Sequence, residues 1–321
     1  MTDVAAIVDD FLRAQLRDEA RMHAAVAAAL DRGGRHAARG KLVRTKCDVI
    51  AHGRAVGRGG RGVVVAEEGD GLLLLGGAAM SVSAAGIPDD VKVSGALLAV
   101  GAVLVALFLR VDRRPGASVL PPSAFGPGPL KWIYLTLGLL MAATMADMYV
   151  PLFGQRLAHL VPVAAGFLGV ALSVGWTVSE IASASVSRTR ATARIVAVAP
   201  LVMAAGLALA AVSQIDEASL SVVAVWVVAL FVAGCGIGMA WPHLSAWAMG
   251  DVADPAEGGV AAAAINTVQL MCGAFGAGLA GVVVNVSGHG DASAARWMFG
   301  LFAGLAALTG IASYRASRAR S

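Results

Sequence analysis

Apolar stretches recur along the chain between residues 71 and 314, and short polar segments separate them. A helix needs about 20 residues to cross a hydrocarbon core of about 30 Å, and most of these stretches reach that length. They predict eight transmembrane helices, over residues 71–87, 93–109, 130–150, 161–182, 195–212, 220–241, 260–286 and 295–314. The first stretch is short and rich in glycine, so a count of seven is the alternative.

Lysine and arginine gather on one side of this predicted arrangement. With the N-terminus inside, ten of them lie in the inner loops and tail after residue 71, and three lie in the outer loops. Twelve more precede residue 71. Because cytoplasmic loops carry an excess of these residues, we expect a multi-pass protein of the plasma membrane with both termini in the cytoplasm.

The residues before the first span have a different pattern. Residues 4–30 carry an imperfect apolar stripe typical of a helix, whereas residues 32–61 are rich in glycine, arginine and histidine and lack periodicity. We therefore expect residues 1–70 to form a basic cytoplasmic region with a helix and a flexible segment. No aromatic residues or known motif accompany the arginines, so we expect no nucleic-acid partner.

Composition agrees with a membrane protein, because 58% of the residues are hydrophobic and only 14% are charged. The three cysteines are far apart and fit neither a zinc site nor a disulfide framework. The chain shows no grouping of nucleophile, base and acid, and no phosphate-binding loop after a strand. The sequence thus predicts an all-α polytopic membrane protein that is not an enzyme and uses no metal or cofactor.

Small residues recur inside the predicted helices, as in residues 233–251, AGCGIGMAWPHLSAWAMGD. In a membrane, such residues let helices approach closely. Gly234 and Gly238 lie four positions apart and share a helix face. Gly273, Ala277 and Gly281 form a second stripe at the same spacing. We expect both sets to pack against neighbouring helices.

Residues 231–285, FVAGCGIGMAWPHLSAWAMGDVADPAEGGVAAAAINTVQLMCGAFGAGLAGVVVN, resemble the tenth and eleventh helices of the major facilitator superfamily, especially its multidrug/proton antiporters. The stretch MYVPLFGQRLAHLVPVAAGFLGVALSVGW is similar to the family's seventh and eighth helices. The resemblance covers residues 130–314 and implies the six-helix C-terminal bundle. The pair over residues 71–113, followed by the basic VDRRPG, resembles the extra central pair of the 14-span branch.

Two departures from the family pattern limit this resemblance. The family's six N-terminal helices and its Gly-rich antiporter motif are absent, and the loop SASVSRTRATAR lacks the family's glycine and aspartate. We expect half of a transporter, with a start that reflects truncation or a shifted frame. A second copy or a separate half-transporter would then complete it. The alternative is a transport-inactive membrane protein or an interaction subunit.

Four polar residues inside the predicted spans, and one just beyond the end of a span, are candidates for a substrate or proton pathway, because polar groups in a membrane are costly. They are Asp147, Glu180, His243, Asn266 and Gln269. Each has a simpler alternative role. Asp147 could be an acid at the membrane interface, Glu180 could pair with cytoplasmic arginines, and His243 could mark the interface. The two amides lie three positions apart on one helix face, where hydrogen bonding between helices is the alternative.

The resemblance implies a function as well as a fold. Transporters of this family work by alternating access, in which two helical bundles move around a central site. We therefore expect efflux of a small amphipathic substrate such as a drug, with protons as the candidate coupling ion and the lipid bilayer as the surroundings.

Overall fold

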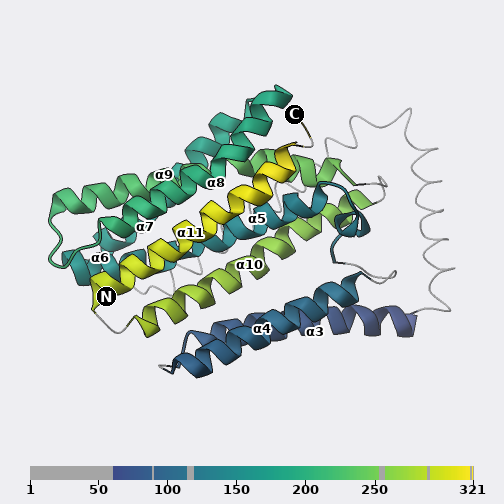
Figure 1. Cartoon of the computed structure of the whole chain (residues 1–321), viewed down its shortest axis with the longest axis horizontal. Helices are drawn as coiled ribbons and strands as arrows, with labels where there is room; N and C mark the ends of the chain where they lie inside the picture. Colours follow the sequence, from purple (N-terminus) through teal and green to yellow (C-terminus); the bar gives the residue numbers. More distant parts are fainter. Residues whose placement is uncertain are drawn as a thin grey trace, which may run out of the picture. The chain divides into compact units, whose positions relative to one another are not determined.

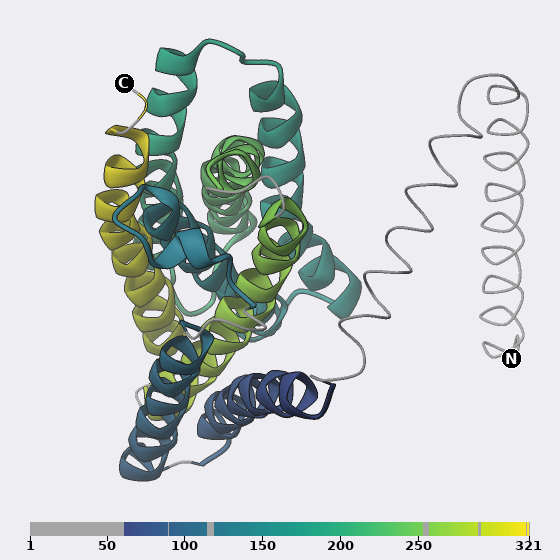
Figure 2. The same cartoon turned by 90° about the vertical axis from the view of Figure 1, so that its right-hand side faces the viewer.

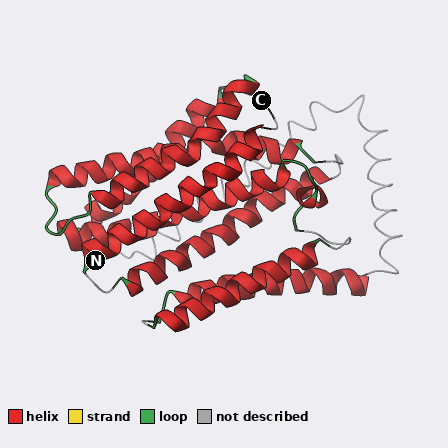
Figure 3. Cartoon of the chain, in the orientation of Figure 1, coloured by secondary structure: helices red, strands yellow, loops and turns green. Residues whose placement is uncertain are grey.

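The computed structural model describes residues 61–88, 90–113, 119–252, 257–287, 290–318 and 320. All regular elements within these ranges are helices, as Figure 3 shows. The predicted all-α fold is therefore confirmed for the described residues. The predictions for residues 1–60, a helix followed by a flexible basic segment, lie outside them.

The helices follow one another with short connections. They are α3 (Arg61–Ala85), α4 (Val91–Asp112), α5 (Leu130–Thr144), α6 (Val150–Ala158), α7 (Pro162–Ala184), α8 (Thr189–Val212), α9 (Leu220–Gly250), α10 (Gly258–Val286) and α11 (Asp291–Arg318) (Figure 1). One 3-10 turn, η1 (Pro122–Phe125), precedes α5, and another, η2 (Met145–Tyr149), joins α5 to α6.

Seven helical segments in the described ranges are long and apolar enough to cross a membrane, with α5, η2 and α6 counted as one. The first predicted span falls short, because the apolar part of α3 is Leu73–Ala85. At 1.5 Å per residue that part measures about 20 Å, less than a hydrocarbon core of about 30 Å. Acidic residues precede it in the sequence. The described residues therefore contain seven helices of spanning length and one shorter apolar helix, which agrees with the alternative count of seven.

Helix α9 has the most neighbours in the bundle. It packs against α5, α6, α7, α8 and α10, while α11 packs against α5, α8 and α10 (Figures 1 and 2). The buried side chains of α9 include Trp226, Leu230, Ile237 and Leu244. All four belong to one core cluster with residues of the surrounding helices. The core of the bundle is thus built around α9.

Alternate glycines let α9 approach two neighbours at once. Positions two apart on a helix point about 200° apart, so Gly236 faces away from Gly234 and Gly238. A Cβ atom on Gly234 or Gly238 would collide with the backbone of α7, and one on Gly236 would collide with the backbone of α8 at Met203. Only glycine fits these three positions without moving a helix.

The predicted stripe on α10 makes fewer close contacts than expected. Gly281 lies near the backbone of Gly86, in the connection after α3. Gly273 is buried, but the nearest atoms to a Cβ there are methionine side-chain atoms at 3.8 Å or more. Ala277 is only half-buried. Of the two glycines in the stripe, Gly281 lies against a neighbouring backbone and Gly273 against methionine side chains.

Two other glycines bring α10 close to its neighbours. A Cβ on Gly276 would collide with Ala142 of α5, and one on Gly278 would collide with Val82 of α3. These two glycines are again two positions apart and face different helices. Residues four positions apart lie on one face of a helix. A search for that spacing therefore misses pairs of glycines, such as these, that face two different neighbours.

Helix α9 also extends further than the sequence predicts. The predicted span ends at residue 241, before Pro242, but the helix continues to Gly250. A proline removes one backbone donor, and in a packed bundle the neighbouring helices compensate for that loss. Here His243, Leu244 and Trp247 are buried beyond the proline and hold the last turns against the bundle.

Basic and aromatic side chains meet at one end of the bundle. The Arg315 guanidinium lies 4.5 Å from the ring centroid of Trp132, and that of Arg320 lies 4.6 Å from the ring centroid of Trp247. At the other end, Arg156 and Asp291 form an ion pair at 2.9 Å. Such groups are typical of the two polar boundaries of a membrane.

Gly234→Ala is expected to lower the stability of the bundle. The added methyl group collides with the α7 backbone, and overpacking of this kind costs about 1–3 kcal/mol. The matched control is Gly304→Ala on α11, where no atom lies within 4 Å of a Cβ. Thermal unfolding in mild detergent should show a lower midpoint for the first variant only. Equal midpoints would contradict the close contact between α7 and α9.

Candidate functional site

The α-helical hydrogen bonding of the first span in the bundle is interrupted over five residues, although the backbone stays helical from Leu130 to Ala158, where the sequence predicts a span over residues 130–150. The α-helix ends at Thr144, η2 follows as a 3-10 turn, and α6 begins at Val150. Pro151 in the first turn of α6 cannot donate a backbone hydrogen bond. The backbone N–H of Val150 instead donates to Asp147 O, with 3-10 spacing. The local sequence thus explains the break.

Asp147 lies in this break. Its side chain is half-buried, and Oδ1 is enclosed without a hydrogen-bond partner among the described residues. Helix α7 lies opposite, where a Cβ on Gly169 would be 3.7 Å from Oδ1. The small residue on α7 leaves room beside the carboxyl group. The structure therefore places this candidate within a short 3-10 segment, facing helix α7.

His243 is buried between α9 and α7 and has a defined partner. Its Nε2 lies 2.8 Å from the hydroxyl oxygen of Ser183, and that hydroxyl donates to Met239 O at 2.7 Å. A serine hydroxyl carries one proton, and that of Ser183 is used in the bond to Met239 O. The Nε2–H of His243 is therefore the donor to the Ser183 oxygen, and Nδ1 takes no part in these two hydrogen bonds. His243 thus lies inside the bundle, and Pro242 does not end the helix.

Glu180 makes its contact within α7. The indole N–H of Trp176, one turn earlier, donates to Oε2 of Glu180 at 2.8 Å. The Trp176 ring also packs against Trp241 of α9, with centroids 5.4 Å apart. Pairing with cytoplasmic arginines was the simpler prediction, and the described residues give Glu180 the indole as its partner instead.

The two amides of α10 lie near the outer surface of the described bundle. Asn266 is exposed and Gln269 is half-buried. Between them, Thr267 donates its hydroxyl to Ala263 O at 3.2 Å, within the same helix. Leu270, next to Gln269, is 75% exposed. This part of α10 thus presents a mixed polar and apolar surface.

The five candidates fall into three places rather than one cluster. Glu180 and His243 share the α7–α9 pair, and Asp147 faces Gly169 of α7, eleven residues before Glu180. At 1.5 Å per residue, these two positions on α7 are about 16 Å apart. Asn266 and Gln269 lie on α10, beside α5. A path through the bundle would have to connect these places.

Two partner residues were not among the sequence candidates. Trp176 lies four positions before Glu180, and that spacing places the two side chains on one helix face, so the pair could have been found. Ser183 bonds to a histidine 60 positions away, and no local pattern marks such a pair. Three-dimensional packing alone brings these two groups together.

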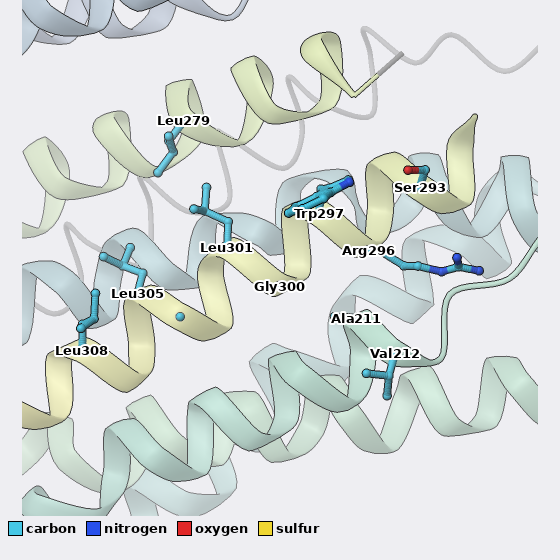
Figure 4. Close-up of a pocket in the computed structure, with 11 residues that line it drawn as sticks. Ala211, Val212, Leu279, Ser293, Arg296, Trp297, Gly300, Leu301, Leu305 and Leu308 are labelled. Carbon is cyan, nitrogen blue, oxygen red and sulfur yellow. The ribbon is translucent and has the colours of Figure 1, made fainter. Parts of the chain in front are cut away.

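The two largest hollows described are lined by none of the five candidates, although one of them borders Thr267. An open groove of about 860 Å³ runs beside α11, and Figure 4 shows Leu301, Leu305 and Leu308 along it with Leu279 of α10 opposite. A cavity of about 510 Å³ lies between α4, α5 and α10, and Thr267 contributes to its wall. Both are lined mainly by apolar side chains. In the described ranges no three His, Cys, Asp or Glu residues are grouped as metal ligands.

Within the described ranges, seven apolar helices of spanning length, one of them with a 3-10 segment that carries a carboxyl group, define a multi-pass helical membrane protein with polar groups inside its bundle. The model of the Major Facilitator Superfamily matches residues 72–277, which is more than half of the chain. The chain belongs to this superfamily. The family predicted from the sequence is thereby confirmed, while the assignments to the C-terminal half and to the 14-span branch stay predictions.

Two curated relatives come from Mycobacterium tuberculosis, strains CDC 1551 / Oshkosh and ATCC 25618 / H37Rv, and both are described as probable multidrug-efflux transporters. Each is 59% identical over 246 residues, which cover 77% of this chain and 52% of the relative. The chain therefore spans about half the length of the curated relatives it matches.

Ser183→Ala is expected to expose His243 to modification. Loss of a hydrogen bond worth roughly 1 kcal/mol should increase the open population about fivefold. Diethyl pyrocarbonate labelling, read by mass spectrometry, measures this rate, and the exposed His159 ring serves as an internal standard. Ser185→Ala, which removes an exposed hydroxyl bonded within α7, is the matched control. A rate unchanged in the first variant would contradict the described bond.

Proposed function

We propose that this chain forms part of a transporter that exports small amphipathic molecules by alternating access, coupled to protons. Membership of the superfamily and the printed descriptions of the two relatives support transport as the activity. The plasma membrane, with both termini in the cytoplasm, is the proposed location, supported by the distribution of lysine and arginine.

The 3-10 segment at Asp147 is the observation that carries this proposal. A 3-10 stretch inside a helix often marks a functional hinge, and an ionisable group within a span is a candidate for a proton path. Asp147 combines both features, with one carboxyl oxygen enclosed beside α7. We assign it the role of proton-binding group.

His243 and Glu180 form the proposed second part of the path. They lie on the α7–α9 pair, and the imidazole keeps Nδ1 available while Nε2–H donates to Ser183. A histidine is able to gain and lose a proton near neutral pH. Movement of α7 against α9 would change the surroundings of both groups together.

The substrate surface is proposed to lie on α7 and α10. These two helices are among the least buried spans of the described bundle. Phe167 and Ile181 of α7 are about 70% exposed, and α10 presents Asn266 beside Leu270. A surface that combines apolar side chains with amides fits a small amphipathic molecule. A second bundle facing these helices would close the site.

Asp147→Asn is expected to abolish transport driven by a proton gradient, because an amide has no proton to exchange at this position. The measurement is accumulation of a fluorescent lipophilic cation in proteoliposomes that contain the purified chain, with a pH difference across the membrane. Asp216→Asn, an exposed acid in the turn before α9, is the control and should retain transport. Gradient-driven transport by Asp147→Asn at the wild-type rate would refute the assigned role. No transport by the unaltered chain would refute the transport function itself.

A second copy of the chain is the proposed opposing bundle, since alternating access requires two bundles. In mild detergent, the fraction that transports after reconstitution should have the mass of at least two copies by size-exclusion chromatography with light scattering. Transport by a fraction with the mass of one copy would contradict this part of the proposal and leave the role of Asp147 standing.

A further inference from the structure

Three arginines surround a hollow at the shared end of α8 and α11. Arg190 and Arg194 come from the first turns of α8, and Arg318 is the last residue of α11. Together with Tyr314 and Ser317, they line a pocket of about 350 Å³. This pocket contains none of the residues assigned to transport above.

The spacing of these residues explains why they meet. The two arginines of α8 lie four positions apart, as do Tyr314 and Arg318, so each pair lies on one face of its helix. The two helices are direct neighbours, and the hydroxyl of Ser313 on α11 donates to Val196 O on α8. The faces that carry the arginines therefore converge on one hollow.

The wall of the pocket is strongly basic. Among the described residues that line it, three are arginines and none is an aspartate or glutamate. Both Arg190 and Arg194 are exposed on the described surface. Arginine guanidinium groups match the oxygens of a phosphate group and bind it through paired hydrogen bonds. The charge of the pocket thus fits an anion, and its arginines are the residue type that binds a phosphate best.

An apolar surface continues from the pocket along both helices. On α8, Val198 and Leu201 follow Arg194 at four and seven positions and are 49% and 54% exposed. On α11, Ile311 and Leu308 precede Arg318 at seven and ten positions and are also exposed. The two stripes meet where a Cβ on Gly310 would lie 3.6 Å from Leu201.

The depth of the pocket follows from the lengths of the two spans. Arg190 lies at the beginning of α8 and Arg318 at the end of α11, and both helices are long enough to cross the membrane. From Arg190 to the end of α8 at Val212 is about 33 Å at 1.5 Å per residue. The arginines therefore lie at the level of the lipid headgroups, and the apolar stripes lie in the hydrocarbon region.

We propose that this pocket binds the phosphate of an anionic phospholipid, whose acyl chains lie along the exposed stripes of α8 and α11. A soluble anion would use the arginines but not the stripes, whereas a phospholipid uses both. Basic pockets between helices at the membrane surface are known to bind anionic headgroups. The site is independent of the proposed transport pathway.

Native mass spectrometry of the full chain in a neutral detergent tests the proposal. The wild type is titrated with phosphatidylglycerol, with the zwitterionic phosphatidylethanolamine, and with phosphatidylglycerol in the presence of excess inorganic phosphate. The test variant is R190Q/R194Q. The matched control is R110Q/R188Q, which removes two exposed arginines that do not line the pocket. Thermal unfolding confirms that all variants are folded.

Phosphatidylglycerol should bind the wild type more tightly than phosphatidylethanolamine, and excess phosphate should not displace it. Each arginine near the headgroup contributes about 1 kcal/mol, which is slightly more than fivefold in affinity for an anionic lipid. R190Q/R194Q should therefore bind phosphatidylglycerol about 30-fold more weakly than the wild type. R110Q/R188Q should bind within about twofold of the wild type. R190K/R194K, which keeps the charge but loses the paired hydrogen bonds, should be intermediate.

Three outcomes would overturn the proposal. If R190Q/R194Q and R110Q/R188Q weaken lipid binding equally, the lipid is attracted by general positive charge and not by a specific pocket. Unchanged binding by R190Q/R194Q would exclude these arginines from the lipid site. Displacement by inorganic phosphate at concentrations similar to those of the lipid would assign the pocket to a soluble anion.

Discussion

The bundle depends on the close approach of α9 to α7 and α8. In hydrocarbon, each helix satisfies its own backbone hydrogen bonds, and helices associate mainly through packing between their surfaces. Gly234 and Gly238 bring α9 against α7, and Gly236 brings it against α8, with no space for a methyl group at any of the three. The same glycines would weaken a helix in water, where they cost about 0.5–1 kcal/mol each. The membrane makes this arrangement favourable.

This contact also positions the polar groups. The bond between His243 and Ser183 and the ring contact between Trp176 and Trp241 both join α7 to α9, and both need the two backbones to lie close together. A small change in the distance between these helices would alter both contacts together. The proposed movement during transport would therefore act directly on the protonatable groups of this pair.

The polar features of the described bundle are distributed by depth. Arg315 on Trp132 and the proposed lipid pocket lie at one end, and the ion pair of Arg156 with Asp291 lies at the other. Asp147 is different, since it lies within a span, in a non-α turn that the sequence explains through Pro151. Charged groups are inexpensive at the membrane surface and costly within it. Its position is thus the one that most requires a functional explanation.

The sequence by itself determined the helical membrane fold, the family and most of the spans, because length and apolar character follow directly from the bilayer. It also indicated Gly234 and Gly238, since spacing along one helix is a local property. The tertiary structure decided which groups meet. In the tertiary structure, His243 is paired with Ser183, and α9 continues beyond Pro242. The backbone contacts of α10 include those at Gly276 and Gly278, which the sequence did not indicate. These features depend on the neighbours of each helix, and periodicity along a single helix does not contain that information.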